Sequence, residues 1–210
     1  MSFIPKVLII AGSDSGGGAG IQADIKTTSY FNGYAMTAIT AITAQNTIGV
    51  QSIYPLPKEI VMEQINSITT DLSPDIVKIG MLADLDIIEY ISKKISNYKI
   101  VLDPVMVATS GDVLVSDEVV SSIKNKLINK SFLITPNIYE AEILSENKIN
   151  CLEDQIEAGK NLLKLGCKHV LVKGGHGNSD IINDVLITSS GDEYIFAVSY
   201  THLTLPTTLS

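Results

Sequence analysis

The sequence predicts an α/β fold with a mostly parallel central sheet and helices on both of its faces. Short apolar runs alternate with longer amphipathic stretches almost to the end of the chain, as expected for repeated β-α units. A chain of 210 residues that is 45% hydrophobic is long enough to bury one sizeable core. The length therefore favours one domain, and the alternation favours a parallel sheet within it.

The expected strands are short and rich in β-branched residues, most clearly the Thr- and Ile-rich run at residues 35–44. The run at 52–54, which lies before Pro55, has the character of an edge strand. In chain order, the expected strands lie at residues 7–11, 35–44, 52–54, 76–79, 100–102, 132–135 and 170–172, with a final hairpin at 184–188 and 194–198.

The expected helices have apolar residues in helical period. The first of them ends at Asn32 and Gly33, a reasonable C-cap, and Gly166 stops the last. In chain order, the expected helices lie at residues 21–31, 59–72, 84–95, 118–128 and 153–165. Each helix follows a strand, which supports the β-α order of the fold class.

The stretch AGSDSGGGAGIQAD at residues 11–24 is the most unusual part of the chain, because four of the five residues at 16–20 are glycine. Glycine lets the backbone approach a ligand closely, and the N-terminus of the following helix favours polar or anionic ligand atoms. We therefore expect a ligand-binding loop. The alternative is a glycine-rich turn that only allows the strand and the helix to pack.

Two common phosphate-binding motifs do not fit this loop. In a Walker-type loop, Lys and Ser or Thr would stand where Gly18 and Ala19 are found. A dinucleotide-binding fingerprint needs an acid about 20 residues further on. No acidic residue lies between Asp24 and Glu59. The loop therefore belongs to neither motif.

Several chemically useful residues lie just past the C-terminal ends of successive predicted strands. In open α/β sheets, ligands bind outside this edge, so we expect the residues to converge on one site. The set consists of Ser13, Asp14, Gln45, Met81, Asp103, Asn137, Glu140 and Lys173.

The chemistry of this set favours a kinase. Lys173, beside two glycines, can place an ammonium group against a phosphate. Asp103 and Glu140 are carboxylates suited to a magnesium ion. Gln45 carries both donors and an acceptor, which suits the edge of an aminopyrimidine. Phosphoryl transfer needs mainly positioning and charge neutralisation of this kind.

Structural roles are the alternatives for several of these residues. Asp103 precedes Pro104 and could serve only to shape a turn. Glu140 opens the stretch 140–144, where a carboxylate suits a first helical turn. Met81 has a core position as its alternative, because methionine is found more often in hydrophobic cores than in contact with ligands.

The composition excludes several classes of partner. Fifteen basic and 23 acidic residues give a net charge of -8, which argues against nucleic-acid and anionic-membrane surfaces. Cys151 and Cys167 lack the spacing of a disulfide framework or a zinc site. No secretory signal and no apolar run of membrane-spanning length is present. We expect a cytoplasmic protein with no nucleic-acid or membrane partner.

Six motifs together resemble a known family. They are AGSDSGGGAGIQAD, TAQNT (43–47), KIGML (78–82), LDPVM (102–106), ITPNIYEAE (134–142) and VKGGH (172–176). In order and spacing they are similar to the hydroxymethylpyrimidine and phosphomethylpyrimidine kinases of thiamine biosynthesis, which have the three-layer ribokinase-like fold. The resemblance covers residues 7–198.

The resemblance implies ATP-dependent phosphorylation of 4-amino-5-hydroxymethyl-2-methylpyrimidine and then of its monophosphate, with ATP and Mg2+ as cofactors. It assigns the pyrimidine pocket to Ala19, Asp24, Gln45, Met81 and Val105. It assigns the metal to Asp103 and Glu140, and the nucleotide phosphates to Lys173 and Asn137. The precedent of the family and the predicted edge strand near Ser52 are compatible with a homodimer.

The sequence departs from the family at its end. Family members continue past the final hairpin into a G-T-G-C segment that supplies the anion hole and the catalytic Cys, whereas no Gly or Cys follows Gly191 here. We expect a kinase domain at residues 1–198 that lacks its C-terminal part, and a non-native or disordered tail at 199–210. A frayed natural terminus is the alternative for the tail.

No catalytic residue is assigned, because Cys151 and Cys167 lie elsewhere in the sequence. Loss of an anion hole alone costs about 10² to 10³ in rate, so little turnover is expected from this chain. Ordinary kinase rates with ATP and hydroxymethylpyrimidine would contradict that expectation.

Two other functions stay open at this point. A pyridoxal or pyridoxine kinase shares the fold and mechanism, although Gln45 and Met81 favour a pyrimidine. A non-catalytic pyrimidine-binding protein would keep the pocket without the transfer reaction.

Overall fold

The computed structural model describes residues 3–106, 115–175 and 181–199. The chain forms two compact units, Met1–Phe132 and Leu133–Ser210. Most of the expected tail, residues 200–210, and His176 of the last motif lie outside the described residues.

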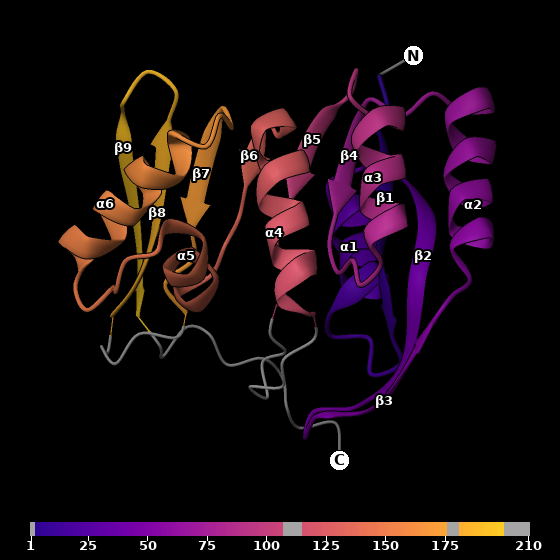
Figure 1. Ribbon diagram of the computed structural model, residues 1–210, viewed down its shortest axis with the longest axis horizontal. Helices are drawn as coiled ribbons and strands as arrows, with labels where there is room; N and C mark the ends of the chain where they lie inside the picture. Colours follow the sequence, from indigo (N-terminus) through magenta and orange to yellow (C-terminus); the bar gives the residue numbers. More distant parts are fainter. Residues whose placement is uncertain (1–2, 107–114, 176–180, 200–210) are drawn as a thin grey trace. The chain divides into compact units, whose positions relative to one another are not determined.

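The first unit contains a five-stranded sheet in the order β3-β2-β1-β4-β5 (Figure 1). All neighbouring strands pair in parallel except β3, which pairs antiparallel with β2 at the edge. The strands are β1 (Lys6–Asp14), β2 (Tyr34–Gln45), β3 (Val50–Pro55), β4 (Ile76–Ile79) and β5 (Lys99–Leu102). The predictions of an edge strand near Ser52 and of a mostly parallel sheet are confirmed in this unit.

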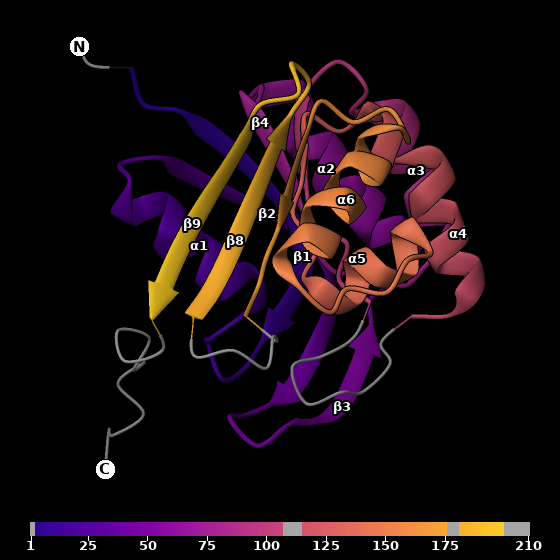
Figure 2. The ribbon, with the colours of Figure 1, turned by 90° about the vertical axis from the view of Figure 1, so that its left-hand side faces the viewer.

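Helices cover both faces of this sheet. One face carries α1, and the opposite face carries α2, α3 and α4 (Figure 2). The helices are α1 (Gly20–Tyr30), α2 (Lys58–Asp71), α3 (Leu85–Lys94) and α4 (Asp117–Lys126), followed by a 3-10 turn at Ile128–Lys130.

The centre of the core is β1, which is apolar on both faces because helices cover both. Leu8, Ile9 and Ile10 have no exposed surface. Ile9 packs with Ala11 and with Ile21 of α1. Each such side chain contributes about 1.5–3 kcal/mol of burial free energy, so β1 holds the two helical layers to one sheet.

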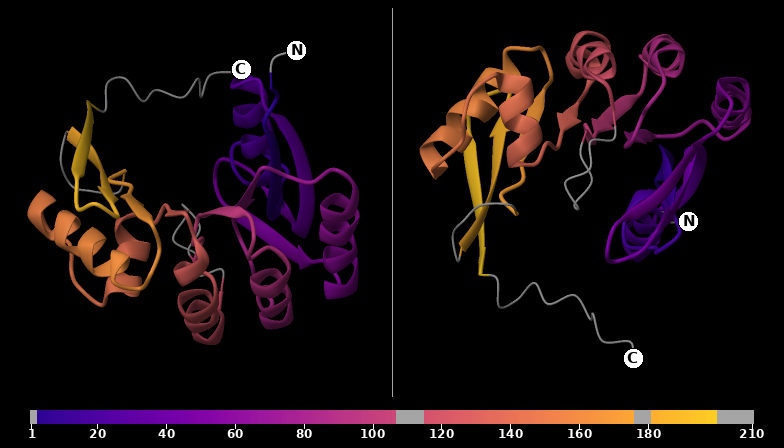
Figure 3. Two further views of the ribbon diagram at one scale, coloured as in Figure 1. Left: turned by 90° about the horizontal axis from the view of Figure 1, so that it is seen from above. Right: turned by 60° about the horizontal axis from the view of Figure 1, so that its bottom comes forward.

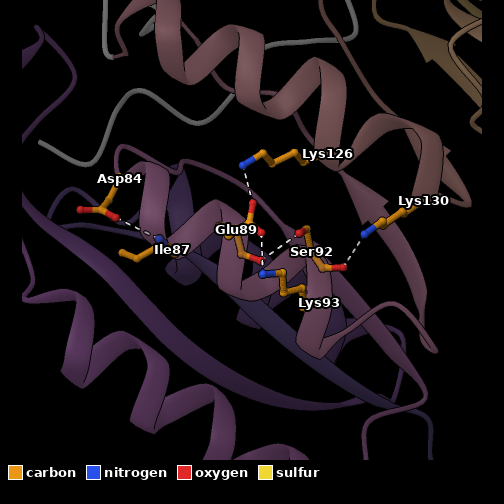
Figure 4. Close-up of polar contacts among 7 residues, drawn as sticks. All are labelled: Asp84, Ile87, Glu89, Ser92, Lys93, Lys126 and Lys130. Carbon is orange, nitrogen blue, oxygen red and sulfur yellow. Dashed lines mark hydrogen bonds and ion pairs between the residues drawn. The ribbon is translucent and has the colours of Figure 1, made fainter.

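Polar side chains join α3 to α4 at the surface (Figure 4). Glu89 of α3 pairs with Lys126 of α4 and, at 2.7 Å, with Lys93 one turn along its own helix. The Nζ atom of Lys130 donates to the carbonyl oxygen of Ser92 at 2.7 Å. The pair of Glu89 and Lys126 joins α3 to α4, and Lys130 joins the following 3-10 turn to α3.

The second unit contains a four-stranded sheet, in which β6 pairs in parallel with β7 and an antiparallel hairpin follows. The helices α5 and α6 lie on one face of this sheet (Figure 3). The elements are β6 (Leu133–Ile134), α5 (Ile138–Ser145), α6 (Leu152–Leu163), β7 (His169–Val172), β8 (Ile181–Thr188) and β9 (Glu193–Ser199).

Several elements differ from the sequence prediction. β1 continues to Asp14, because Ser13 and Asp14 pair with Ile42 and Thr43 of β2. The helix α4 ends at Lys126 and gives way to a 3-10 turn.

The other difference lies in the second unit. β6 has only two residues, and α5 follows it with Asn137 as its N-cap. The sequence analysis recognised only a possible first helical turn at Glu140, because α5 is short and its apolar residues do not gather on one face.

Candidate functional site

The strands β1, β2, β4 and β5 run in parallel, so their carboxyl ends lie along one edge of the first unit's sheet. This edge carries Gln45 at the end of β2, Met81 after β4 and Asp103 after β5. The predicted convergence of strand ends is therefore realised within this unit for these three residues.

The glycine-rich loop at this edge is organised by the carboxylate of Asp14, which is 5% exposed. Its Oδ1 atom accepts the N–H of Gly16 at 2.7 Å, and its Oδ2 atom accepts those of Gly18 at 3.0 Å and Ala19 at 2.8 Å. Three N–H groups of the predicted ligand-binding loop are thus already bonded to the chain's own carboxylate. Ala19 can still offer its methyl group to a ligand.

The turn from the loop into α1 requires a glycine. Gly20 has a φ of +55°, and a Cβ atom there would lie 2.4 Å from the carbonyl oxygen of Gly12. The loop therefore folds back tightly onto β1, which accounts for part of its glycine content by packing alone.

The loop is tied to the end of β2 through Ser15 and Gln45. The Ser15 hydroxyl lies 2.7 Å from the carbonyl oxygen of Gln45 and 2.8 Å from its backbone nitrogen, donating to the first and accepting from the second. The Gln45 side chain reaches the hydroxyl of Thr43, with 3.2 Å between the oxygens. The backbone of Gln45 is thereby fixed, and its amide group lies beside the loop.

Asp24 of α1 has a partner that the sequence analysis missed. The Nζ atom of Lys78 lies 2.6 Å from Oδ2 of Asp24, and the two side chains are 21% and 22% exposed. The signal was available in the sequence, because Lys78 interrupts the apolar strand IVKI. A lysine in a parallel strand covered on both faces needs a buried or half-buried acceptor.

Met81 and Val105 complete the residues predicted for the first unit. The hydroxyl of Thr40 donates to the carbonyl oxygen of Met81 at 2.9 Å. The N–H of Val105 donates to the carbonyl oxygen of Asp103 at 2.8 Å, in a tight turn after β5. Met81 is half-buried, so it is available at the surface of this edge.

The second unit brings together Asn137, Glu140 and Lys173. Asn137 and Lys173 form an isolated parallel bridge, and the N–H of Lys173 donates to the carbonyl oxygen of Pro136 at 2.8 Å. Gly174 follows where a Cβ atom would lie 2.2 Å from the carbonyl oxygen of Asn183. The glycine after Lys173 is thus required by packing.

Glu140 has a structural role in this unit. It forms a capping box with Asn137, in which each side chain accepts the backbone N–H of the other at 2.9 Å. Glu140 is 2% exposed. The helical interpretation of this carboxylate is therefore supported, and its assignment to a metal remains a prediction.

The residues suggested for magnesium have the right donor chemistry, because Asp103 and Glu140 offer carboxylate oxygens. Oxygen Oε2 of Glu140 already accepts the N–H of Asn137. Within the described residues, no three His, Cys, Asp or Glu side chains form a cluster that could hold a metal ion. One or two carboxylates with substrate phosphates are an ordinary magnesium site, so the residues fit that mode of binding.

Neither cysteine has the environment of a nucleophile. Cys167 is buried, and burial raises the pKa of its thiol to about 11. Cys151 is exposed at the start of α6. A backbone hydrogen bond with Asp154 lowers the pKa of its thiol, but hydrogen bonds with the Glu153 and Asp154 carboxylates leave the pKa raised on balance. Both are therefore thiols at neutral pH, and it stays a prediction that neither is the catalytic cysteine.

The comparison with known proteins identifies the family of this chain. A model of the phosphomethylpyrimidine kinase family matches residues 14–204. A hydroxymethylpyrimidine/phosphomethylpyrimidine kinase of Bacillus subtilis is 49% identical over 191 residues, covering 89% of this chain and 70% of that protein. The chain belongs to the phosphomethylpyrimidine kinase family. The resemblance inferred from the six motifs is confirmed.

Solved structures of this kinase family and of pyridoxal kinases share the fold. Phosphomethylpyrimidine kinase from Clostridium difficile 630 has a TM-score of 0.83 and 42% identity, covering 92% of this chain and 84% of that one. Pyridoxal kinase from Staphylococcus aureus in complex with pyridoxal has a TM-score of 0.86 and 31% identity, covering 94% and 73%. The predicted ribokinase-like fold is confirmed. None of the helices described for this kinase is long and apolar enough to cross a membrane.

Proposed function

We propose that this chain binds 4-amino-5-hydroxymethyl-2-methylpyrimidine and takes part in its ATP-dependent phosphorylation, and in that of its monophosphate, in thiamine diphosphate biosynthesis in the cytoplasm. The observation that carries the proposal is the amide of Gln45. It lies at the carboxyl edge of the sheet, and its backbone is held against the glycine loop by Ser15. An amide offers a donor and an acceptor side by side, which matches an aminopyrimidine edge.

The first unit supplies the acceptor side of the reaction. Ala19, Asp24, Gln45, Met81 and Val105 form the proposed pyrimidine pocket. Asp24, held by Lys78, provides a charged acceptor, and Met81 provides an apolar surface for the ring. These residues bind and orient the hydroxymethyl group.

The second unit supplies the phosphate side. Lys173 and Asn137 would contact the phosphates of ATP. Glu140 in this unit and Asp103 in the first unit each offer a carboxylate oxygen of the kind that magnesium prefers. The metal, when bound, neutralises phosphate charge. In the transfer, the hydroxymethyl oxygen bonds to the γ-phosphorus, ADP leaves, and the hydroxyl proton is released.

Pyridoxal phosphorylation is the second candidate, supported by the likeness to the Staphylococcus aureus pyridoxal kinase. Calorimetry with the 210-residue chain distinguishes the two, because it reports binding without turnover. We expect hydroxymethylpyrimidine to bind more tightly than pyridoxal. Tighter binding of pyridoxal would favour the second candidate, and binding of neither ring would refute both.

The response to nucleotide separates the remaining possibility, a non-catalytic pyrimidine-binding protein. Addition of ATP or a nonhydrolysable analogue to the pyrimidine complex should change the heat of binding if the second unit contacts phosphates. A pyrimidine complex that does not respond to either nucleotide would support the non-catalytic function.

A further inference from the structure

The side-chain hydroxyl of Thr43 lies between two oxygen atoms. It is 2.9 Å from the carbonyl oxygen of Ser13 in β1 and 3.2 Å from Oε1 of Gln45, two residues along its own strand. Thr43 is 7% exposed, so water cannot readily replace either partner. Thr43 is buried and Ser13 and Gln45 are half-buried, and the three groups form one small network at the ends of β1 and β2.

The hydrogens in this network can be counted. A threonine hydroxyl carries one hydrogen and accepts through its lone pairs, whereas a carbonyl oxygen only accepts. With Oε1 of Gln45 facing Thr43, one of the two contacts brings oxygen against oxygen with no hydrogen between them. Rotation of the amide by 180° places Nε2 there instead. Thr43 then donates to Ser13 and accepts from Gln45, and both contacts are hydrogen bonds.

We propose that Thr43 is a positioning residue that fixes the Gln45 amide with Nε2 toward Thr43. Oxygen Oε1 and the second Nε2 hydrogen then face the ligand in one fixed order. Ser15 holds the Gln45 backbone from both sides, and the contact with Thr43 adds a restraint on the orientation of the terminal amide. This inference rests on the proposed function, since it requires Gln45 to contact the pyrimidine.

The fixed order specifies the ligand. Oε1 needs a donor opposite it, and the Nε2 hydrogen needs an acceptor. A 4-aminopyrimidine presents that pair through its amino group and adjacent ring nitrogen. The 4-oxo analogue presents a carbonyl oxygen and a ring N–H, which is the reverse order. Thr43 therefore acts as a determinant of specificity for the amino form.

Calorimetry on the 210-residue chain tests this with 4-amino-5-hydroxymethyl-2-methylpyrimidine and its 4-oxo analogue. We expect wild type to prefer the amino form, and Thr43→Val to reduce the ratio of the two affinities by about tenfold or more, because the amide becomes free to rotate. Thr43→Ser, which keeps the hydroxyl, should restore the ratio.

Thr40→Val is the matched control. It removes another buried hydroxyl of β2, one that donates to the carbonyl oxygen of Met81 and does not contact Gln45. Thr40→Val can weaken binding of both pyrimidines. The ratio of the affinity for the amino form to that for the 4-oxo analogue should stay that of wild type. A Thr43→Val ratio within about twofold of wild type would overturn the proposal.

A second measurement covers the case in which Thr43→Val does not fold. In the NMR spectrum of the wild-type chain, nuclear Overhauser contacts should join the Nε2 hydrogens of Gln45 to the side-chain hydrogens of Thr43. Their absence in a well-resolved spectrum would overturn the orientation. If wild type binds neither pyrimidine, the proposed function itself fails. If it binds the amino form and Thr43→Val keeps the preference, only the role of Thr43 fails.

Discussion

The carboxylate of Asp14 satisfies three backbone N–H groups of the loop that follows it. Gly16, Gly18 and Ala19 thus adopt their places before any ligand arrives. The loop is shaped by the chain's own charge, and its glycines provide the tight backbone path. We therefore expect ligand contacts in this region to come from side chains held by the loop, such as Gln45.

Asp14→Asn should destabilise the conformation of this loop. An asparagine has one acceptor oxygen, so at least one of the three N–H groups loses its acceptor and meets an NH2 group. We expect the free energy of unfolding to fall by about 1–3 kcal/mol and pyrimidine binding to weaken with it. Urea unfolding and calorimetry measure the two effects.

Asp71→Asn is the control for this change, because Asp71 is an exposed residue at the end of α2. Asp71→Asn should have the same free energy of unfolding as wild type. If Asp14→Asn also unfolds and binds like wild type, the carboxylate is not what shapes the loop.

Lys78→Met should reduce pyrimidine affinity through Asp24. Methionine keeps much of the side-chain volume but leaves the half-buried carboxylate without its cation, and such a group turns toward water. A hydrogen bond to a charged group is worth about 1.5–3 kcal/mol, so we expect affinity to fall by about tenfold or more. Calorimetry with hydroxymethylpyrimidine measures the change, and Lys78→Arg should recover part of the loss.

Lys148→Met is the matched control, since it removes another lysine ion pair, the one with Glu142 at 2.8 Å. The Lys148 side chain is 81% exposed. Exposed pairs contribute little, so pyrimidine binding should be unchanged. Equal affinity in Lys78→Met and wild type would show that the pair with Asp24 does not support binding.

At the scale of elements, the contact between α3 and α4 depends on a carboxylate with an altered pKa. Hydrogen bonds from Lys126 and Lys93 lower the pKa of Glu89 from 4.5 to about 2. A carboxyl whose pKa is lowered on folding stabilises the protein above its unfolded pKa, and that contribution is lost as the pH falls through the folded value. The Glu89 side chain is 39% exposed, so solvent and salt screen the effect.

Glu89→Gln should therefore lower stability most clearly above pH 4.5, and its difference from wild type should shrink as the pH approaches 2. Thermal unfolding at low salt across this range measures the effect. Glu63→Gln, at an exposed position of α2, serves as the control. A difference that does not change with pH would refute the role of the Glu89 charge.

The helix α5 shows why one element could not be predicted in full. Its apolar residues do not gather on one face, so helical periodicity does not reveal it. Asn137 and Glu140, three residues apart, are a capping-box pattern and mark its start. The family resemblance assigns the same two residues to phosphate and metal binding. The capping box is a second, structural reason for their presence.

At the scale of the molecule, the proposed pyrimidine pocket lies in the first unit and the proposed phosphate contacts Asn137 and Lys173 lie in the second. Hydrogen exchange should distinguish the pyrimidine pocket from the phosphate contacts. Hydroxymethylpyrimidine should protect backbone amides at the glycine loop and the end of β2. A nonhydrolysable ATP analogue should protect amides around Lys173.

The experiment needs no variant as a control, because the pyrimidine and the ATP analogue serve as controls for each other in the same protein. The opposite result is protection of backbone amides of the glycine loop by the nucleotide analogue, with unchanged exchange around Lys173. That result would contradict the assignment of the nucleotide to the second unit. The homodimer inferred from the family stays a prediction, which the mass of the chain in solution would test.

The sequence by itself determined the fold class, the family and most strand and helix positions. Hydrophobic periodicity and glycine spacing are local properties, and six motifs in a fixed order are specific together. It also placed Gln45, Met81 and Asp103 at strand ends, because parallel strands bring their carboxyl ends to one edge.

Only the tertiary structure decided which groups satisfy one another. Asp14 takes the N–H groups of the loop, Lys78 reaches Asp24 across 54 positions of sequence, and Thr43 lies against Ser13 and Gln45. Apart from the contact between Thr43 and Gln45 within β2, each of these contacts joins neighbouring strands, or a strand and a helix or loop. Their distances depend on the packing of the sheet against α1, and no local pattern in the sequence encodes that packing.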